Sequence, residues 1–190
     1  QNRNRPSMET AMHVFLPKYV LHTHSIFCNV FLCMKSGFKY LSRIFSDLSV
    51  CFIPYVSPGF SLGTAIAKAP KSNIYFLQNH GMIVCGETLT ELCERFSLVM
   101  DRSRHVLQEK ITKIPNWPRH HRGIFHRFLF PDAAVYSTKK ESSGALETLA
   151  AQEYLLTLIA KLGGRPRYLS SMASTYLQRM EAEQYRQNLL

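Results

Sequence analysis

The sequence has no long uninterrupted hydrophobic run. Its longest apolar cluster, Ile26 to Met34, is broken by Asn29 and falls short of the roughly 18 residues that a membrane-spanning helix needs. No apolar core follows the opening residues, Gln-Asn-Arg-Asn-Arg, so no secretory signal peptide is recognisable. We therefore expect no membrane contact, and a cytoplasmic location.

Cysteine is also scarce. The 190 residues include five cysteines, an odd number, and no Cys-x-x-Cys pair. This pattern argues against a disulfide scaffold and against a zinc finger. We expect the thiols to be reduced core residues in a chain whose 46% hydrophobic content suffices for a substantial core.

Acidic residues are few: 13 Asp and Glu against 23 Lys and Arg give a formal net charge of +10. Such an excess suits either nucleic acid or anionic metabolites. The densest basic run, Arg119-His120-His121-Arg122 and on to Arg127, has no recognised nucleic-acid-binding module beside it. We expect no nucleic-acid partner, and we expect the histidines of this run to be solvated rather than to form a metal cluster.

The motif that organises the chain is Val20-Leu21-His22-Thr23-His24-Ser25. Side chains alternate faces along an extended strand, so His22 and His24 point to the same side, roughly 7 Å apart at ~3.3 Å per residue. Two imidazoles on one face can bind one metal ion. A His-x-His pair also occurs by chance on apolar strands, so the motif alone leaves both interpretations open.

A third histidine lies in a tight corner between two apolar runs. Asn79-His80-Gly81 separates Ile74 to Leu77 from Met82 to Cys85, a pattern that predicts a strand, a turn and another strand. Three histidines with an open fourth position are a ligand set typical of catalytic Zn²⁺. The sequence therefore predicts a metal site built from His22, His24 and His80.

A carboxylate precedes the His-x-His strand. Ser7 is a plausible N-cap for a short helix that Pro17 ends, and Glu9 would then lie in the first helical turn. This placement would bring Glu9 close to the following strand. A carboxylate beside a three-histidine metal site is a candidate general base.

Together these motifs resemble the class II aldolase/adducin family, which includes fuculose-phosphate aldolase, rhamnulose-phosphate aldolase and ribulose-phosphate 4-epimerase. The resemblance runs from about Pro6 to about Lys110. It rests on the order of the following elements: Ser7, Glu9 and His13, then His22 and His24, then Pro54-Tyr55, then Asn79-His80-Gly81.

The resemblance implies an α/β fold of three layers, with a mostly antiparallel central sheet flanked by helices. It implies Zn²⁺ or another divalent metal as cofactor, Glu9 as catalytic base, and Ser7, Tyr55, Asn79 and Gly81 as substrate-binding residues. It also implies a sugar or sugar-phosphate substrate and a homo-oligomer, a tetramer. The second serine of the family's phosphate-binding Ser-Ser pair is Met8 here, which leaves open whether the substrate is phosphorylated.

The expected organisation is a family-like core over residues 1–112, lacking the family's usual N-terminal part, and a linker with a C-terminal module over 113–190. Periodicity and turn signals predict the elements of both parts. We expect helices over 8–16, 61–68, 88–110, 146–162 and 170–188, a mostly helical stretch over 26–48, strands over 18–24 and 50–56, a hairpin over 73–85, and a short strand over 130–136.

The function implied by these features is metal-dependent retro-aldol cleavage through a Zn-stabilised enediolate, with Glu9 moving the proton at the adjacent carbon. The same residues would serve an epimerase, a dehydratase or a decarboxylase of the family. A non-catalytic, adducin-like interaction protein, or an incomplete enzyme, is the alternative from another class.

Overall fold

The structure, a computed structural model, describes residues 7–118, 125–137 and 143–181. Its elements in chain order are α1 (Thr10–His13), β1 (Tyr19–Thr23), α2 (Ile26–Leu32), α3 (Gly37–Ile44), β2 (Cys51–Ile53), α4 (Phe60–Lys68), β3 (Ile74–Leu77), β4 (Gly81–Gly86), α5 (Leu89–Lys110), α6 (Pro131–Tyr136), α7 (Ser143–Lys161) and α8 (Ser171–Arg179).

The four strands form one sheet in the order β1-β4-β3-β2. β1 pairs with β4 and β4 with β3 in antiparallel fashion, whereas β2 runs parallel to β3. The predicted hairpin is therefore present, and its two strands occupy the centre of the sheet. Along β3 and β4 every residue is buried, as expected for strands covered on both faces.

Two hydrophobic clusters lie on opposite faces of this sheet, because successive side chains alternate. Phe76 belongs to the main cluster, with Met82 and the buried residues of α2, α3, α5 and the C-terminal helices. The second cluster consists of Met12, Cys51, Ile53, Leu62, Ile66, Tyr75, Leu77, Ile83 and Cys85. The sheet is therefore the middle of three layers.

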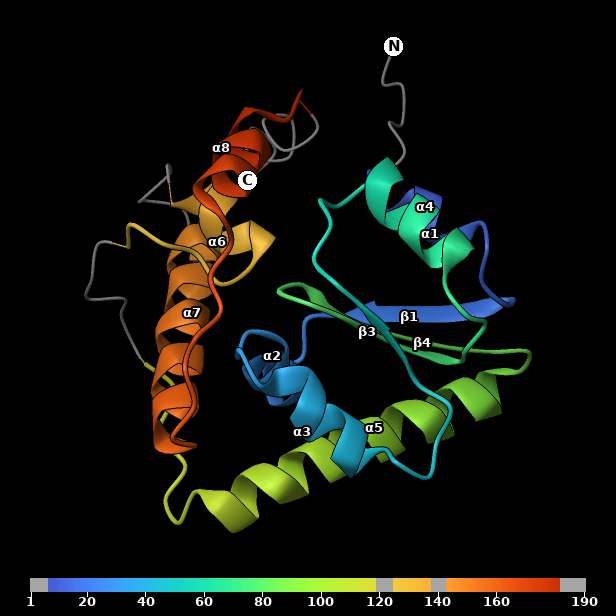
Figure 1. Cartoon of the computed structure of the whole chain (residues 1–190), viewed down its shortest axis with the longest axis horizontal. Helices are drawn as coiled ribbons and strands as arrows, with labels where there is room; N and C mark the ends of the chain where they lie inside the picture. The colour runs from blue at the N-terminus through green and yellow to red at the C-terminus, as the bar shows by residue number, and fades with distance from the viewer. Residues whose placement is uncertain (1–6, 119–124, 138–142, 182–190) are drawn as a thin grey trace.

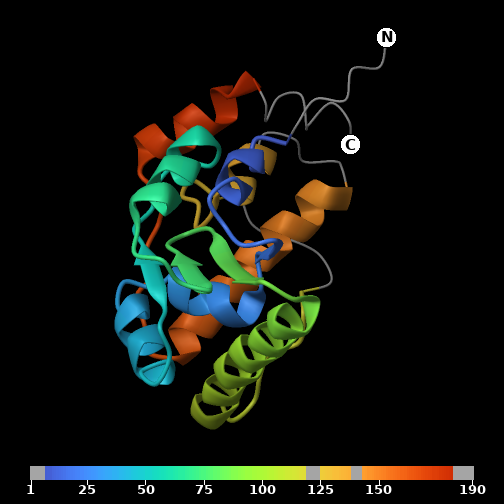
Figure 2. The same cartoon turned by 90° about the vertical axis from the view of Figure 1, so that its right-hand side faces the viewer.

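The helices cover the two faces unequally (Figures 1 and 2). α1 and α4 pack on each other on the side of the second cluster. α2, α3 and α5 lie on the other side, with α5 along the bottom of Figure 1. This arrangement confirms the expected α/β fold of three layers with a mostly antiparallel sheet.

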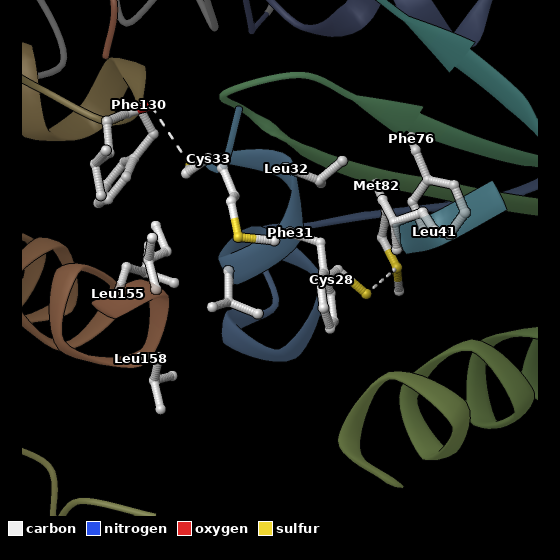
Figure 3. Packing of buried hydrophobic residues seen from close by; sticks show 14 of the residues in the cluster. Cys28, Phe31, Leu32, Cys33, Leu41, Phe76, Met82, Phe130, Leu155 and Leu158 are labelled. Carbon is white, nitrogen blue, oxygen red and sulfur yellow. Dashed lines mark hydrogen bonds between the residues drawn. The ribbon is translucent and has the colours of Figure 1, made fainter. Parts of the chain in front are cut away.

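The C-terminal helices pack on α2, which lies between them and the sheet. Figure 3 shows Phe130, Leu155 and Leu158 on one side of α2, and Phe76 and Met82 on the other. α7 contacts α2, and α6 contacts both α7 and α8. The helical C-terminal region thus shares the main cluster with the sheet; its separation as a module over 113–190 stays a prediction.

Residues 130–136 form a helix, α6, and not the short strand that the sequence suggested. Pro131 occupies the first helical turn, where its fixed φ favours a helix and its missing N–H costs nothing. Asp132 follows in the same turn, where a carboxylate is favourable. Val135 and Tyr136 are residue types that favour strands, but here both are buried residues of the helix α6.

The first helix is also shorter than expected. It starts at Thr10, with Glu9 and not Ser7 at the N-cap position, so Glu9 is not within the first turn. Ser7 makes a different contact: its Oγ accepts a hydrogen bond from the Glu9 N–H at 3.2 Å. In the longest helix, α5, Thr88 is the N-cap, and its side chain accepts a hydrogen bond from the Glu91 N–H. α8 ends at Arg179, and residues 182–188 of the predicted helix lie outside the described part.

Among the described residues, no helix combines the length and the apolar character required to cross a bilayer.

Candidate metal centre

The sheet topology brings the three histidines together. His22 of β1 lies directly opposite Ile83 of β4, so it projects from the face of the second cluster, as Ile83 does. His24 follows just after β1, and its ring centroid lies 4.9 Å from that of His22. His80 occupies the corner between β3 and β4, with its ring 4.9 Å from His22 and 5.0 Å from His24.

Glu9 completes the group from the segment that leads into α1. Its Oε1 lies 3.2 Å from His80 Nε2 and 3.6 Å from His22 Nε2. One ligand atom from each of Glu9, His22, His24 and His80 lies within 4.8 Å of all the others. Among the described residues, these four form the single His, Cys, Asp or Glu group with this spacing. The sequence thus identified all four members of the cluster.

Two of the imidazoles are held by hydrogen bonds from their outer nitrogens. His22 Nδ1 lies 3.0 Å from the Met82 carbonyl oxygen, an acceptor, which places the ring proton on Nδ1. His24 Nδ1 lies 3.2 Å from a carboxylate oxygen of Asp132, which assigns its proton in the same way. Such outer partners fix the tautomer and the orientation of a metal-binding histidine.

The consequence is that two lone pairs face each other. His22 Nε2 and His24 Nε2 are 3.1 Å apart, and neither carries a proton when both Nδ1 atoms donate outward. Two lone pairs at this distance repel unless a cation or proton lies between them. The donor set therefore fits a divalent cation bound by imidazole nitrogens.

His80 is the most buried member of the site. Burial lowers the pKa of His80 to about 4, against the opposing hydrogen bond with Glu9, so the ring is neutral at neutral pH. Its buried Nδ1 has no hydrogen-bond partner in the described structure. A neutral imidazole is the form that binds a metal.

Glu9 is ionised in this setting. Burial acts to raise the pKa of Glu9, but the combined interactions with the neighbouring His22 and His80 rings outweigh burial and hold that pKa well below the usual range. The Glu9 side chain is 32% exposed, whereas the His80 side chain is 3% exposed. A small molecule can therefore reach the carboxylate. A reachable, ionised carboxylate next to three imidazoles can act as a base.

Gly81 allows the strands to approach each other at the site. A Cβ at this position would lie 2.5 Å from the Thr23 carbonyl oxygen and 2.8 Å from His24 Cδ2. Any side chain would displace the His24 ring. The structure thus gives Gly81 a steric role, while the substrate contact that the resemblance implied for it stays a prediction.

The other predicted site residues lie around the same corner. Asn79 is buried, and its Nδ2 donates to the carbonyl oxygens of Leu129 and Arg167, both at 2.7 Å. The Tyr55 N–H donates to Gln78 Oε1, and burial raises the pKa of the Tyr55 phenol. Ser7 is exposed and bonded to the Glu9 backbone. Their substrate-binding roles stay predictions.

Histidines predicted to be bystanders lie outside the group. His105 is exposed on α5 and forms an ion pair with Glu109 at 3.2 Å, and His126 is exposed as well. His120 and His121 lie outside the described residues. The sequence did not identify Asp132, whose contact with His24 joins distant parts of the chain, and no local pattern marks it.

Comparison with known proteins agrees with this geometry. The family model described as Class II Aldolase and Adducin N-terminal domain matches residues 1–105. The chain is 30% identical over 114 residues to a Bacillus subtilis protein named uncharacterized oxidoreductase YuxG; the match covers 57% of this chain and 16% of that protein. The chain thus spans about a sixth of that curated relative.

A solved structure, that of the N-terminal class II aldolase domain of a conserved protein from Thermoplasma acidophilum, is also similar. Its TM-score to this chain is 0.49 at 28% sequence identity, over 54% of this chain and 48% of the other.

Proposed function

This chain belongs to the class II aldolase and adducin family, and from that premise we propose that it is a metal-dependent lyase that cleaves a sugar or related hydroxy-ketone by a retro-aldol reaction. The observation that carries the proposal is the convergence of Glu9, His22, His24 and His80 within 4.8 Å. An interaction protein without catalysis has no physical need for three converging imidazoles beside an ionised carboxylate.

His22, His24 and His80 would hold Zn²⁺ or another divalent metal. When bound, such a metal supplies Lewis-acid stabilisation of the negative charge that develops on the oxygens of a hydroxy-ketone. The Met82 carbonyl and the Asp132 carboxylate keep the imidazoles of His22 and His24 oriented toward the site. Burial keeps His80 neutral and available as a ligand.

Glu9 would move the proton at the carbon next to the carbonyl. In the condensation direction its carboxylate removes that proton, and the electron pair left on carbon is delocalised over the carbonyl oxygen. In the cleavage direction the hydroxyl group of the departing carbon would give its proton to Glu9, directly or through water, as that carbon becomes the aldehyde. The electron pair of the broken carbon–carbon bond passes to the hydroxy-ketone, and Glu9 returns the proton to its carbon. The 32% exposure of its side chain leaves room for the hydroxymethylene carbon to approach.

The test is isotope exchange, because the proton step can be followed without the aldehyde. Metal-loaded protein should exchange the hydroxymethylene hydrogen of dihydroxyacetone, or of dihydroxyacetone phosphate, with deuterated water. Glu9→Gln keeps the shape of the side chain but cannot accept the proton, so we expect the metal to stay bound and exchange to fall by roughly 10²-fold or more. Mass spectrometry of the recovered ketone measures the rate.

Glu94→Gln is the matched control, since Glu94 is exposed on α5. It should exchange at the wild-type rate. If metal-loaded wild type exchanges neither ketone, aldolase chemistry is contradicted, and an epimerase, a dehydratase, a decarboxylase or an adducin-like binding role takes its place. The homotetramer implied by the family stays a prediction.

A further inference from the structure

A cavity opens beside the candidate metal centre, and His24 forms part of its wall. The cavity has a volume of about 330 Å³ and lies between the start of α2 and the helices α6 and α7. Most of its lining comes from residues beyond 105, where the family match ends. Its volume lies at the lower end of the range for small-molecule sites, which suits a fragment of a few carbons.

The acidic side chains of this wall are acceptors, whereas the Trp117 indole N–H and the hydroxyls of Tyr136 and Thr148 can donate. Asp132 and Glu147 contribute carboxylates. Asn29 is only 2% exposed, and its Nδ2 donates to the His80 carbonyl oxygen, whereas its Oδ1 is buried with no hydrogen-bond partner in the described structure. An unsatisfied buried oxygen is costly, and a ligand that brings a donor would remove that cost.

The apolar part of the wall includes three aromatic side chains, Trp117, Phe130 and Tyr136. Trp117 is 44% exposed and packs against Tyr154, with the ring centroids 5.2 Å apart. Phe130 and Leu155 add further apolar surface. The C–H groups of a sugar chain can bury against such surface while its hydroxyls reach the acceptors.

The described lining residues include no lysine and no arginine. A phosphate group would bring negative charge to a wall whose described charged side chains are the carboxylates of Asp132 and Glu147. Like charges placed together in this way disfavour binding. Hydroxyl groups carry no charge and can donate hydrogen bonds to the carboxylates of Asp132 and Glu147.

We propose that this cavity binds the end of the substrate remote from the reacting carbonyl, and that this end is an uncharged, hydroxyl-bearing carbon chain and not a phosphate ester. The inference rests on the proposed function and specifies its substrate class.

Trp117 is the single tryptophan of the chain, so its fluorescence reports on this cavity directly. The experiment titrates metal-loaded protein with D-ribulose and with D-ribulose 5-phosphate, whose phosphate is at the end remote from the carbonyl. We expect both to share the reacting end and ribulose to bind at least about 10-fold more tightly, with a saturable change in Trp117 emission.

Glu147 tests the charge argument, because it is exposed on α7 and makes no contribution to the metal centre. Glu147→Gln should reduce the preference for ribulose, and Glu147→Lys should reverse it in favour of the phosphate ester. Glu153→Gln is the control on the same helix, since Glu153 does not line the cavity. It should keep the wild-type ratio.

The proposal is overturned if the phosphate ester binds as well as ribulose, if the Glu147 variants leave the ratio unchanged, or if neither ligand alters Trp117 emission. Isotope exchange separates this result from a failure of the proposed function. If the protein exchanges the hydroxymethylene hydrogen but binds the phosphate ester more tightly, the proposed lyase chemistry stands and only the proposed substrate class is wrong. If ribulose changes Trp117 emission but no hydrogen exchange occurs, the proposed binding cavity stands and the proposed lyase function is wrong.

Discussion

At the scale of single residues, the contact between Asp132 and His24 joins the C-terminal region to the metal centre. The carboxylate lies 3.2 Å from His24 Nδ1, and 21% of the Asp132 side chain is exposed. A carboxylate behind a ligating histidine fixes the ring and increases its basicity. We therefore propose Asp132 as a positioning residue, which would act on a bound metal through His24.

Replacing Asp132 should weaken metal binding without removing it. We expect Asp132→Ala to raise the metal dissociation constant by about 10- to 100-fold, and Asp132→Asn, which can still accept a hydrogen bond through its amide oxygen, to have a smaller effect. Competition with a chelating indicator measures both constants. Asp101→Ala on α5 is the control. Equal affinities in wild type and Asp132→Ala, with both proteins folded, would show that the contact does not serve the metal.

The members of the site differ in how far the sequence could predict them. His22 and His24 were predictable because strand alternation is a local rule, and His80 because a turn signal marks its corner. Asp132 and Asn29 carry no such signal. They reach the site only because α2 packs on the sheet and α6 packs on α7, which in turn contacts α2. No local pattern specifies this tertiary packing.

At the scale of elements, the corner between β3 and β4 is attached to the C-terminal region by one side chain. Asn79 has φ +54°, a left-handed conformation that asparagine tolerates better than most residues. Its amide donates two hydrogen bonds to the carbonyl oxygens of Leu129 and Arg167. The corner that positions His80 therefore depends on both parts of the chain.

Asn79→Ala should destabilise the protein by about 2–4 kcal/mol, since it removes two hydrogen bonds and places a less tolerant residue at positive φ. The Leu129 carbonyl oxygen would keep only the weak donor Cys33 Sγ, and the partly buried Arg167 carbonyl oxygen would lose its Asn79 donor. Urea unfolding followed by circular dichroism measures the free energy of unfolding. Asn79→Asp separates the two causes, because aspartate tolerates this φ but cannot donate when ionised. A change below about 0.5 kcal/mol for Asn79→Ala, the size typical of neutral surface substitutions, would contradict the account.

Most elements were predictable from periodicity, and the exceptions have physical causes. The predicted strands over 18–24 and 50–56 and the hairpin over 73–85 are present, with ends shifted by one to a few residues. The mostly helical stretch over 26–48 is two helices, separated around Lys35 and Ser36. For residues 130–136, Pro131 at the helix start outweighed the strand preference of Val135 and Tyr136.

At the scale of the whole molecule, the cysteines report on how the core is packed. All five are free, and Cys93 on α5 is exposed while the other four are buried. Burial raises the pKa of Cys28 and of Cys85 to about 11, and that of Cys33 still further. Buried thiols with raised pKa values carry little thiolate at pH 8, the form that reacts.

A thiol-specific disulfide reagent at pH 8 should therefore modify one cysteine per folded chain within minutes, and peptide mapping should identify it as Cys93. In denaturant all five should react. Cys93→Ser should remove the fast reaction and leave the slow ones unchanged. Rapid modification of two or more thiols in the folded protein would mean that the described core is not packed as we report.

The central claim is that Glu9, His22, His24 and His80 form a metal site in the folded chain. The most direct measurement is the metal content per chain by elemental analysis after exhaustive dialysis, in wild type and in His80→Ala. His105→Ala, exposed on α5, is the control. We predict about one divalent ion per chain in wild type and in the control, and little in His80→Ala, because a three-histidine site that loses one ligand binds weakly. Wild type without metal after reconstitution with Zn²⁺, or His80→Ala with a full equivalent, would contradict the claim.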